Sequence, residues 1–278
     1  MSRKEHILSF VNATGHGLEI GPSHNPIAPK REGFDVEIID HCSQAELVEK
    51  YKSHGVPVEN IEEVDYVWRG GGYVELTGKS SYYDWIVASH MVEHTPDLIG
   101  FLCESDKVLR NDGVLSMVVP DKRFCFDHFR PITGLAALVD AHYDQRKIHT
   151  PGRVAEYFMN VVSLSGQIAW SAAFESQIRQ GKYAFVHDIE EAKSGVNAVR
   201  EHQAYLDVHA WCFTPSSFRL LIEDIYLLGL SPLREKHFVD AHGEFYVALS
   251  RQGSGHGMSR MDLLKKIEDE MAESRSRA

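Results

Sequence analysis

The sequence predicts an α/β protein with a doubly wound, mostly parallel seven-stranded sheet, an antiparallel C-terminal hairpin and a largely helical insertion. Strand and helix patterns alternate over residues 1–120, and this alternation stops between 121 and 212. A helix and a two-strand hairpin pattern follow in 213–251. We therefore expect residues 1–120 and 213–251 to form the core, 121–212 to form a cap, and 252–278 to form a linker and helix.

The first part of the core contains five segments with the pattern of strands. Most are apolar runs bounded by Gly, Pro or Asn/Asp clusters, and they span residues 17–21, 34–40, 61–68, 83–90 and 113–120. The fourth segment is almost entirely apolar, as expected for a strand covered on both faces. Helical composition separates the strands at 45–52 and 98–110, and Asn111-Asp112-Gly113 is expected to end the second helix.

The second part of the core begins with a helix over residues 215–228, because Thr214 suits its N-cap and Pro215 its first position. Strands are expected at 230–239 and 244–250, separated by a short Asp-Ala-His-Gly turn. A final helix carries apolar side chains that predict peripheral packing or a homodimer. These side chains are Leu263, Leu264, Ile267 and Met271.

Composition excludes several functional classes. A net charge of −11 without clustered Lys and Arg argues against a nucleic-acid partner. No apolar run approaches the roughly 20 residues of a membrane span, and residues 1–10 lack a signal-peptide core. The four cysteines form no CxxC pair, which argues against disulfides or a thiolate zinc site. We therefore expect a cytoplasmic protein.

The first two strands end in residues suited to binding an adenosine. Gly21 lets a ligand approach the backbone closely, and the Asp40 carboxylate can accept both ribose hydroxyls. The loop after Gly21 reads Pro-Ser-His-Asn-Pro and lacks the G-x-G-x-x-G that seats a pyrophosphate. Glu19 would also repel a pyrophosphate, whereas a carboxylate suits a cationic sulfonium or ammonium group.

These segments resemble motifs of the class I S-adenosylmethionine-dependent methyltransferases. The resemblance covers Leu18–Gly21, Ile38–Asp40, the Ser-His-x-x-Glu-His run at 89–94 and residues 109–113. It departs from the family where G-x-G-x-G becomes Gly21, Ser23 and Asn25. It implies the Rossmann-like methyltransferase fold and S-adenosylmethionine as cofactor. By position it places six residues at that cofactor, namely Glu19, Gly21, Asp40, Asp65, Ser89 and His90, with Asp65 near the adenine.

A cluster of His90, Glu93 and His94 follows the fourth strand, at i, i+3 and i+4 of one turn. Three interpretations remain open. The favoured one has the cluster orient the loop and the cofactor by hydrogen bonds. In the second, His94 or His90 is a general base. The third is a divalent metal site, as in the similar Glu/His cluster of small-RNA 2′-O-methyltransferases. The sequence alone leads us to assign no metal ligand.

The insertion is expected to bind the methyl acceptor. Asp121, Lys122 and Arg123 follow the fifth strand, where the two basic side chains could hold an anionic group or pair with a neighbouring Asp. The alternating run 205–211 would place Tyr205, Asp207, His209 and Trp211 on one side of an extended segment. Such a surface suits a sugar or another small polar molecule, although packing between cap and core explains it equally well.

The sequence thus predicts methyl transfer to a polar acceptor, most simply a hydroxyl of a saccharide or glycolipid precursor. The catalytic candidates are His94, His209 and Asp207, and the acceptor-binding candidates are Asp121, Lys122, Arg123, Tyr205 and Trp211. Two alternatives stay open: a nicotinamide-dependent sugar oxidoreductase and an inactive binding subunit with the same fold.

Overall fold

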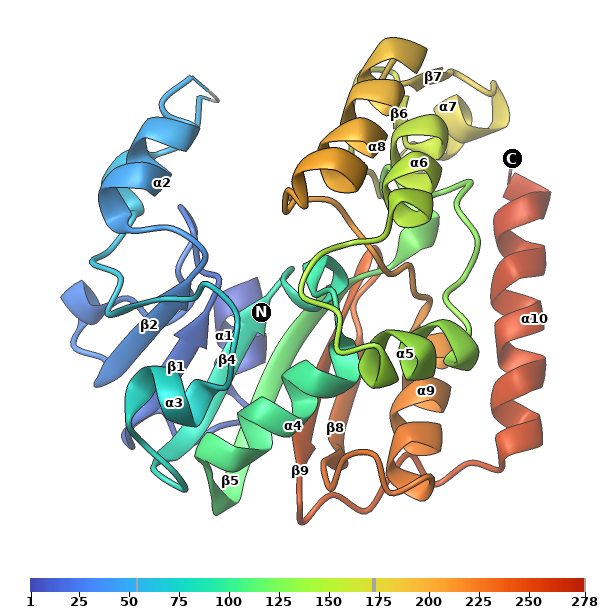
Figure 1. Ribbon diagram of the computed structural model, residues 1–278. Coiled ribbons are helices and arrows are strands. Elements are labelled where there is room, and N and C mark those ends of the chain that lie inside the picture. Colours follow the sequence, from blue (N-terminus) through green and yellow to red (C-terminus); the bar gives the residue numbers. More distant parts are fainter. Residues whose placement is uncertain (54, 172–173, 278) are drawn as a thin grey trace.

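The structure is a computed structural model that describes residues 1–53, 55–171 and 174–277 (Figure 1). Its main sheet has seven strands in the order β3-β2-β1-β4-β5-β9-β8. Their bounds are β1 Gly17–Ile20, β2 Val36–Asp40, β3 Tyr66–Val67, β4 Tyr83–Ser89, β5 Leu109–Pro120, β8 Arg234–Asp240 and β9 Glu244–Ser250. The first five strands run parallel, whereas β9 is antiparallel to both β5 and β8. This is the predicted Rossmann-like methyltransferase fold.

The helices follow the predicted alternation with two additions at the N-terminal side. They are α1 Arg3–Leu8, α2 Gln44–Tyr51, α3 Tyr73–Thr77, α4 Leu98–Val108, α5 Leu135–Tyr143, α6 Pro151–Asn160, α7 Glu175–Arg179, α8 Ile189–His202, α9 Pro215–Leu227 and α10 Arg260–Arg277. The helices α1 and α3 were not predicted from the sequence. As predicted, Thr214 caps α9 by accepting from the amide of Ser217, and Pro215 lies in its first turn.

Alternating side chains of the central strands build two hydrophobic layers. Ile86 and Ala88 of β4 lie in the larger layer, which contains buried side chains of α4, α5 and α9. Trp85 and Val87 point to the opposite face, where they pack with Ile7 of α1. Both faces of β4 are therefore covered, which explains its nearly continuous apolar sequence.

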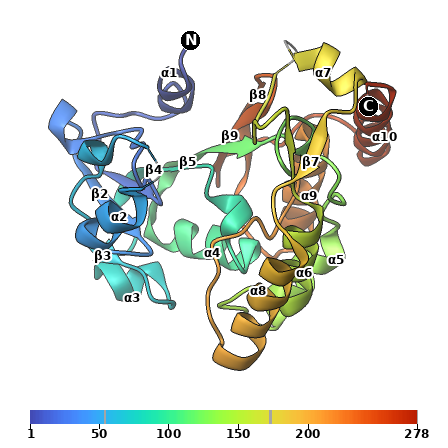
Figure 2. The same cartoon turned by 90° about the horizontal axis from the view of Figure 1, so that it is seen from above.

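The segment between β5 and α9 forms the helical region expected from the sequence (Figure 2). It also contains a two-stranded antiparallel sheet of β6 Val162–Leu164 and β7 Tyr183–Phe185, which the sequence analysis did not predict. The segment has two hydrophobic clusters, one around Trp170 and one around Val154 of α6. These clusters give it packing of its own beside the sheet.

The C-terminal helix α10 packs along α9 (Figure 1). Arg260 forms an ion pair with Asp224, Glu270 accepts from Ser216, and the side chain of Leu263 is fully buried. In the part of the chain that the structure describes, no helix combines the length and the apolar character needed to cross a bilayer.

Candidate functional site

The winding of the sheet reverses between β1 and β4, and sheets of this kind bind ligands outside the carboxyl ends of the strands at such a point. Gly21 follows β1 at this point with a φ of +68°, and its amide donates to the carbonyl of Ile39. A Cβ atom on Gly21 would lie 2.8 Å from Cγ of Met91. The corner therefore requires glycine for both its backbone conformation and the space beside Met91.

Asp40 ends β2 next to this glycine corner and is almost fully buried. Its Oδ2 accepts from the amide of Ser23, in the loop after Gly21, at 3.2 Å. Its Oδ1 lies 2.7 Å from the amide and 2.6 Å from the ring Nδ1 of His41. The structure thus brings together the carboxylate and the glycine turn that the sequence analysis paired.

Glu19 has a more local role than the sequence predicted. Its two carboxylate oxygens accept from the amides of Ile27 and Ala28, at 2.6 and 3.0 Å. Burial raises the pKa of Glu19 to about 7, although the two amides act in the opposite direction. We therefore correct its assignment as a methionine-end contact: Glu19 fixes the loop that follows Gly21.

The predicted adenine contact of Asp65 is also corrected. Its carboxylate accepts from the amide of Ile38, two residues before the end of β2, and from Lys30. It therefore lies below the carboxyl edge of the sheet. Trp68 follows β3 at that edge, where its amide donates to the carbonyl of Asp40 at 2.8 Å.

At the end of β4, Ser89 is followed by His90, which has a left-handed φ of +50°. The Nε2 atom of His90 lies 2.9 Å from Glu244 at the start of β9. Arg3 and Tyr246 also donate to Glu244, and together with His90 they hold its pKa below the ordinary value despite burial. His90 is thereby fixed between β4 and β9.

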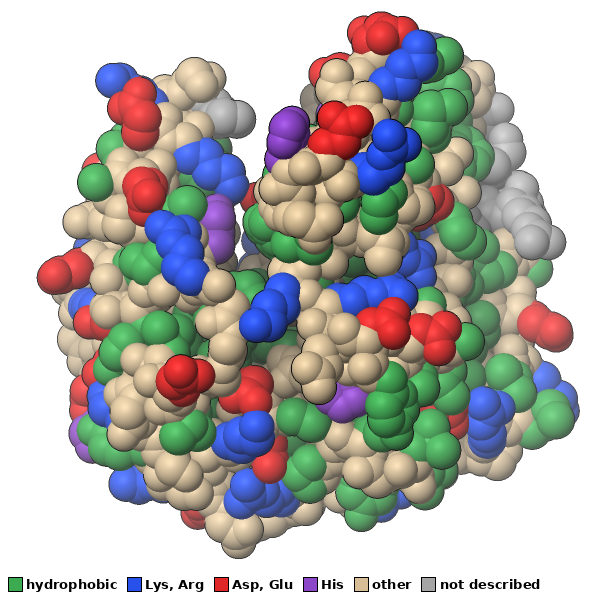
Figure 3. Space-filling view, viewed as in Figure 1, with side chains coloured by type: hydrophobic (Ala, Val, Ile, Leu, Met, Phe, Trp, Pro, Cys, Tyr) green, Lys and Arg blue, Asp and Glu red, His purple; other side chains and the backbone are tan. Residues whose placement is uncertain are grey.

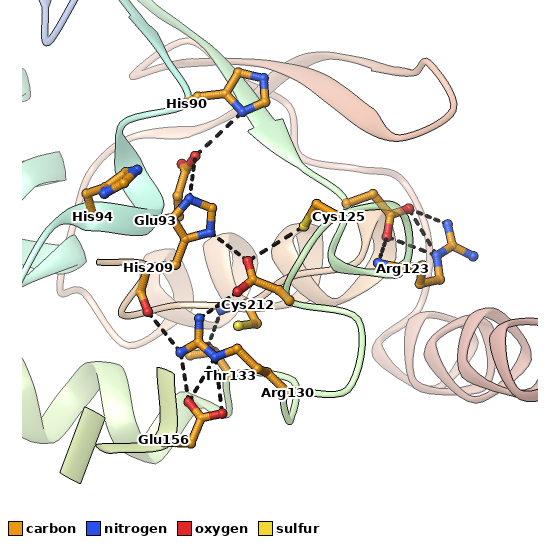
Figure 4. A network of polar contacts seen from close by, with 12 residues as sticks. His90, Glu93, His94, Arg123, Cys125, Arg130, Thr133, Glu156, His209 and Cys212 are labelled. Atoms are coloured by element: carbon orange, nitrogen blue, oxygen red, sulfur yellow. Dashed lines mark hydrogen bonds and ion pairs between the residues drawn. The ribbon is translucent and has the colours of Figure 1, made fainter. Parts of the chain in front are cut away.

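The predicted cluster around Glu93 is present, and His209 joins it from a distant part of the chain (Figure 4). The ring centroids of His94 and His209 are 4.5 Å apart and their planes are nearly perpendicular. Oε1 of Glu93 lies 3.6 Å from Nδ1 of His90 and 3.8 Å from Nε2 of His209. One buried carboxylate therefore faces imidazoles from two segments.

A buried ion-pair network supports His209 from the insertion (Figure 4). Asp127 lies 2.6 Å from Nδ1 of His209 and accepts from Arg130 at 2.6 Å. Arg130 also donates to Glu156 of α6 and to the carbonyl of His209. Burial opposes ionisation of Asp127, but His209 and Arg130 lower its pKa to about 2.

A groove runs between the α2 region and the insertion (Figure 3). Asp207 pairs with His94 and with Lys50 of α2. Its Oδ1 lies 2.9 Å from Nδ1 of His94, and its Oδ2 accepts from Lys50 of α2 at 2.8 Å. Burial alone would lower the pKa of His94, but Asp207 and Glu93 raise it. Nζ of Lys50 also lies 3.2 Å from His41, the neighbour of Asp40.

Three predicted acceptor residues, Asp121, Lys122 and Arg123, are paired within the protein, and the first two are buried. The Arg123 guanidinium forms a fork with Asp121, and Lys122 donates to the carbonyl of His128 at 2.6 Å. Burial lowers the pKa of Lys122. These contacts argue against the prediction that the three side chains bind the acceptor. Arg123 pairs with Asp121, but the pair is largely buried and not exposed on the surface as the alternative expected.

Trp211 is corrected for the same reason, since only 2% of it is exposed. Its indole donates to the carbonyl of Thr95 at 2.6 Å, and the guanidinium of Arg153 lies over its ring. Tyr205, in contrast, is 38% exposed, with its hydroxyl 3.4 Å from the carbonyl of His94 and its ring beside His149. Of the two predicted aromatic residues, Tyr205 alone lies open beside the cluster.

Sequence reasoning missed several polar residues of the site. These are Lys50, Arg130, Glu156 and Glu244. Arg130 follows Asp127 at i+3, and this spacing could have suggested their pairing. Glu156 and Glu244 come from α6 and β9, so no sequence spacing connects them to the histidines.

No family model and no curated protein match the sequence. Among solved structures, a methyltransferase from Methanosarcina mazei is 14% identical with a TM-score of 0.43, and the match covers 90% of this chain and 96% of that one. A provisionally described Zn-dependent alcohol dehydrogenase from Rhodobacter sphaeroides is 12% identical with a TM-score of 0.42, over 90% and 88%. A trans-methyltransferase in complex with S-adenosylhomocysteine is 20% identical with a TM-score of 0.29, over 40% and 33%.

Likeness at this level does not identify an activity, so the assignment depends on the topology of this chain. The sheet has five parallel strands, wound in two directions from β1 and β4. The strand β9 then pairs antiparallel with β5, and β8 pairs antiparallel with β9. The methyltransferase-like motifs lie at the ends of β1, β2 and β4. By this sheet order and the position of these motifs, the chain has the fold of the class I S-adenosylmethionine-dependent methyltransferases.

Proposed function

We propose that this protein is an S-adenosylmethionine-dependent methyltransferase that methylates a hydroxyl group of a polar acceptor. The observation that carries the proposal is the buried carboxylate of Asp40 beside the left-handed turn at Gly21. Both lie at the point where the winding of the sheet reverses, which is where ligands of such sheets bind.

The residues at this point suit the adenosine of S-adenosylmethionine better than a dinucleotide. A carboxylate such as Asp40 can accept two ribose hydroxyls, and Trp68 lies beside it for the base. The described residues between β1 and β2 form no α-helix. A dinucleotide enzyme places its pyrophosphate at the N-terminus of such a helix, and this chain lacks that feature between these two strands.

Methyl transfer to a hydroxyl requires the protein to do two things to the acceptor. When bound, S-adenosylmethionine supplies a methyl group on a sulfonium whose sulfur keeps the bonding electron pair. The protein must align the acceptor oxygen and receive its proton. We assign proton acceptance to His94 or His209, with Asp207 and Asp127 stabilising the resulting imidazolium ions at 2.9 and 2.6 Å.

A saccharide hydroxyl is the acceptor that we propose for this arrangement. Tyr205 offers a partly exposed aromatic ring next to the histidines, and aromatic rings with nearby polar groups bind sugars well. The burial of Trp211 removes the second predicted ring, so Tyr205 carries this part of the proposal.

Calorimetric titration of the full chain with S-adenosylhomocysteine tests the donor assignment. We expect binding in the micromolar range at one site per chain. Absence of heat at millimolar ligand would contradict the proposal. A fluorescence change with NADH in place of that binding would favour the oxidoreductase instead.

A second assay tests turnover. The protein is incubated with S-adenosylmethionine and a panel of hydroxyl-bearing saccharides, and the demethylated product is quantified. We expect product that depends on both the acceptor and an intact His209. Donor binding without turnover on any member of the panel would argue for a binding subunit and against the enzyme.

A further inference from the structure

The carboxylate of Glu93 is buried and forms no hydrogen bond with the described residues. None of its side chain is exposed, and neither oxygen has a hydrogen-bond partner among the described residues. Its backbone is fixed in place, because its carbonyl accepts from the amide of Ala210 at 2.7 Å. Buried polar groups are nearly always satisfied, and an unpaired buried carboxylate is costly. The position of Glu93 therefore calls for a cation.

The imidazoles nearest to Oε1 of Glu93 are those of His90 and His209, at 3.6 and 3.8 Å, and both lie beyond hydrogen-bond distance. Glu93, His94 and His209 each offer one ligand atom, and these atoms all lie within 4.8 Å of one another. Metal–ligand bonds of about 2.1 Å keep neighbouring ligand atoms roughly 3 to 4 Å apart, so small side-chain rotations would complete a site.

A hydrogen-bonded carboxylate orients the imidazole of His209 as metal sites require, and a second carboxylate lies close to the imidazole of His94. The carboxylate of Asp127 accepts a hydrogen bond from Nδ1 of His209. The lone pair of Nε2 then faces Glu93. Arg130 pairs with Asp127, and Glu156 pairs with Arg130, so a network within the insertion holds the ring of His209. Asp207 lies 2.9 Å from Nδ1 of His94. A carboxylate behind each ligating imidazole is the usual support of metal-binding histidines.

We propose that Glu93, His94 and His209 bind one divalent transition-metal ion. Two imidazoles and one carboxylate suit Zn²⁺, Mn²⁺, Fe²⁺ or Co²⁺, and three protein ligands leave positions open for water or a substrate oxygen. Binding of the ion does not depend on the proposed methyl transfer, whereas its use on an acceptor hydroxyl does. With the ion bound, His94 and His209 are ligands and not bases, so a metal requirement for turnover distinguishes the two roles.

The test uses the untagged full chain, stripped with EDTA and titrated with Co²⁺ while visible absorption is recorded. We expect bands of protein-bound Co²⁺ that saturate at one ion per chain and are displaced by Zn²⁺. The melting temperature of the protein should rise when Co²⁺ is added and return to that of the stripped protein when EDTA removes the ion. Absence of both the bands and the melting shift at millimolar Co²⁺ would overturn the proposal.

Variants locate the site. Glu93→Gln should weaken Co²⁺ binding at least tenfold, whereas His142→Asn should not change it, because the His142–Asp97 pair lies outside the cluster. Unchanged binding by a folded Glu93→Gln protein would refute the assignment. If Glu93→Gln does not fold, Asp127→Asn provides the test. We expect its affinity for Co²⁺ to fall tenfold to hundredfold, and an unchanged affinity would refute the assignment. S-adenosylhomocysteine titrations of the same proteins report the donor site separately, so failure of the metal site does not count against methyl transfer.

Discussion

At the scale of single residues, the neighbours of a side chain decide whether it can bind a ligand or is already bonded within the protein. Lys122 and Arg123 follow β5, as predicted, yet Lys122 is buried against a backbone carbonyl and the partly buried Arg123 pairs with Asp121. Sequence spacing grouped Glu93 with His94, and both lie in one cluster with His209. Asp207 pairs with His94 and Lys50, and not with His209. Sequence spacing could not show that the oxygens of Glu93 lack hydrogen-bond partners, so a metal site stayed one of three open interpretations of this cluster.

The buried carboxyl group of Glu19 should make the free energy of unfolding depend on pH. Burial raises its pKa from 4.5 to about 7, so the folded state keeps a proton that the unfolded state loses first. The free energy of unfolding should therefore fall as pH rises from 4.5 to 7, by about 3 kcal/mol if Glu19 acts alone. Urea denaturation at pH 5 and pH 8 measures this loss. Glu19→Gln cannot ionise and should lack it, and identical pH dependence of the two proteins would contradict the account.

At the scale of elements, periodic segments were predicted and irregular ones were not. The strand expected at 61–68 is only Tyr66–Val67, because the Asp65 side chain takes the amide of Ile38 that a longer β3 would pair. The residues expected to end a helix at 111–113 lie within β5, which begins at Leu109 opposite Tyr83. The short strands β6 and β7 depend on tertiary contacts within the insertion.

The turn after β1 gives a matched pair of glycine variants. Gly21 and Gly78 have φ values of +68° and +69°, but only a Cβ at Gly21 meets a neighbour, Met91. Gly78→Ala should destabilise by about 1 kcal/mol through the backbone alone. Gly21→Ala should destabilise by about 1–3 kcal/mol more through overpacking, and should weaken S-adenosylhomocysteine binding. Equal losses in thermal denaturation would contradict the close contact with Met91.

Arg130 ties together three parts of the insertion through Asp127, Glu156 and the carbonyl of His209. Arg130→Met leaves a buried carboxylate without its guanidinium, so we expect a loss of about 3–5 kcal/mol in the free energy of unfolding. Lys193→Met removes an exposed pair with Glu190 on α8 and should change stability by less than about 1 kcal/mol. Similar effects of the two variants in urea denaturation would show that the buried network does not stabilise the insertion.

At the scale of the whole molecule, the doubly wound sheet and its C-terminal hairpin were predictable because strand periodicity and the final turn are local signals. The assembly of the site was only partly predictable. Asp40, His41, Lys50, Asp207 and His94 form one chain of polar contacts across the groove, from β2 through α2 to the segment before α9. Tertiary packing sets those contacts, and no spacing in the sequence encodes them.

The central claim is that Asp40 holds the adenosine of S-adenosylmethionine. The most direct test compares the affinity for S-adenosylhomocysteine of the wild type, Asp40→Asn and Asp112→Asn, since Asp112 is an exposed aspartate on β5. Circular dichroism confirms that each protein is folded. We expect Asp40→Asn to bind about 10- to 100-fold more weakly, as loss of a charged hydrogen-bond acceptor implies, and Asp112→Asn to bind like the wild type. Wild-type affinity in a folded Asp40→Asn protein would contradict the claim.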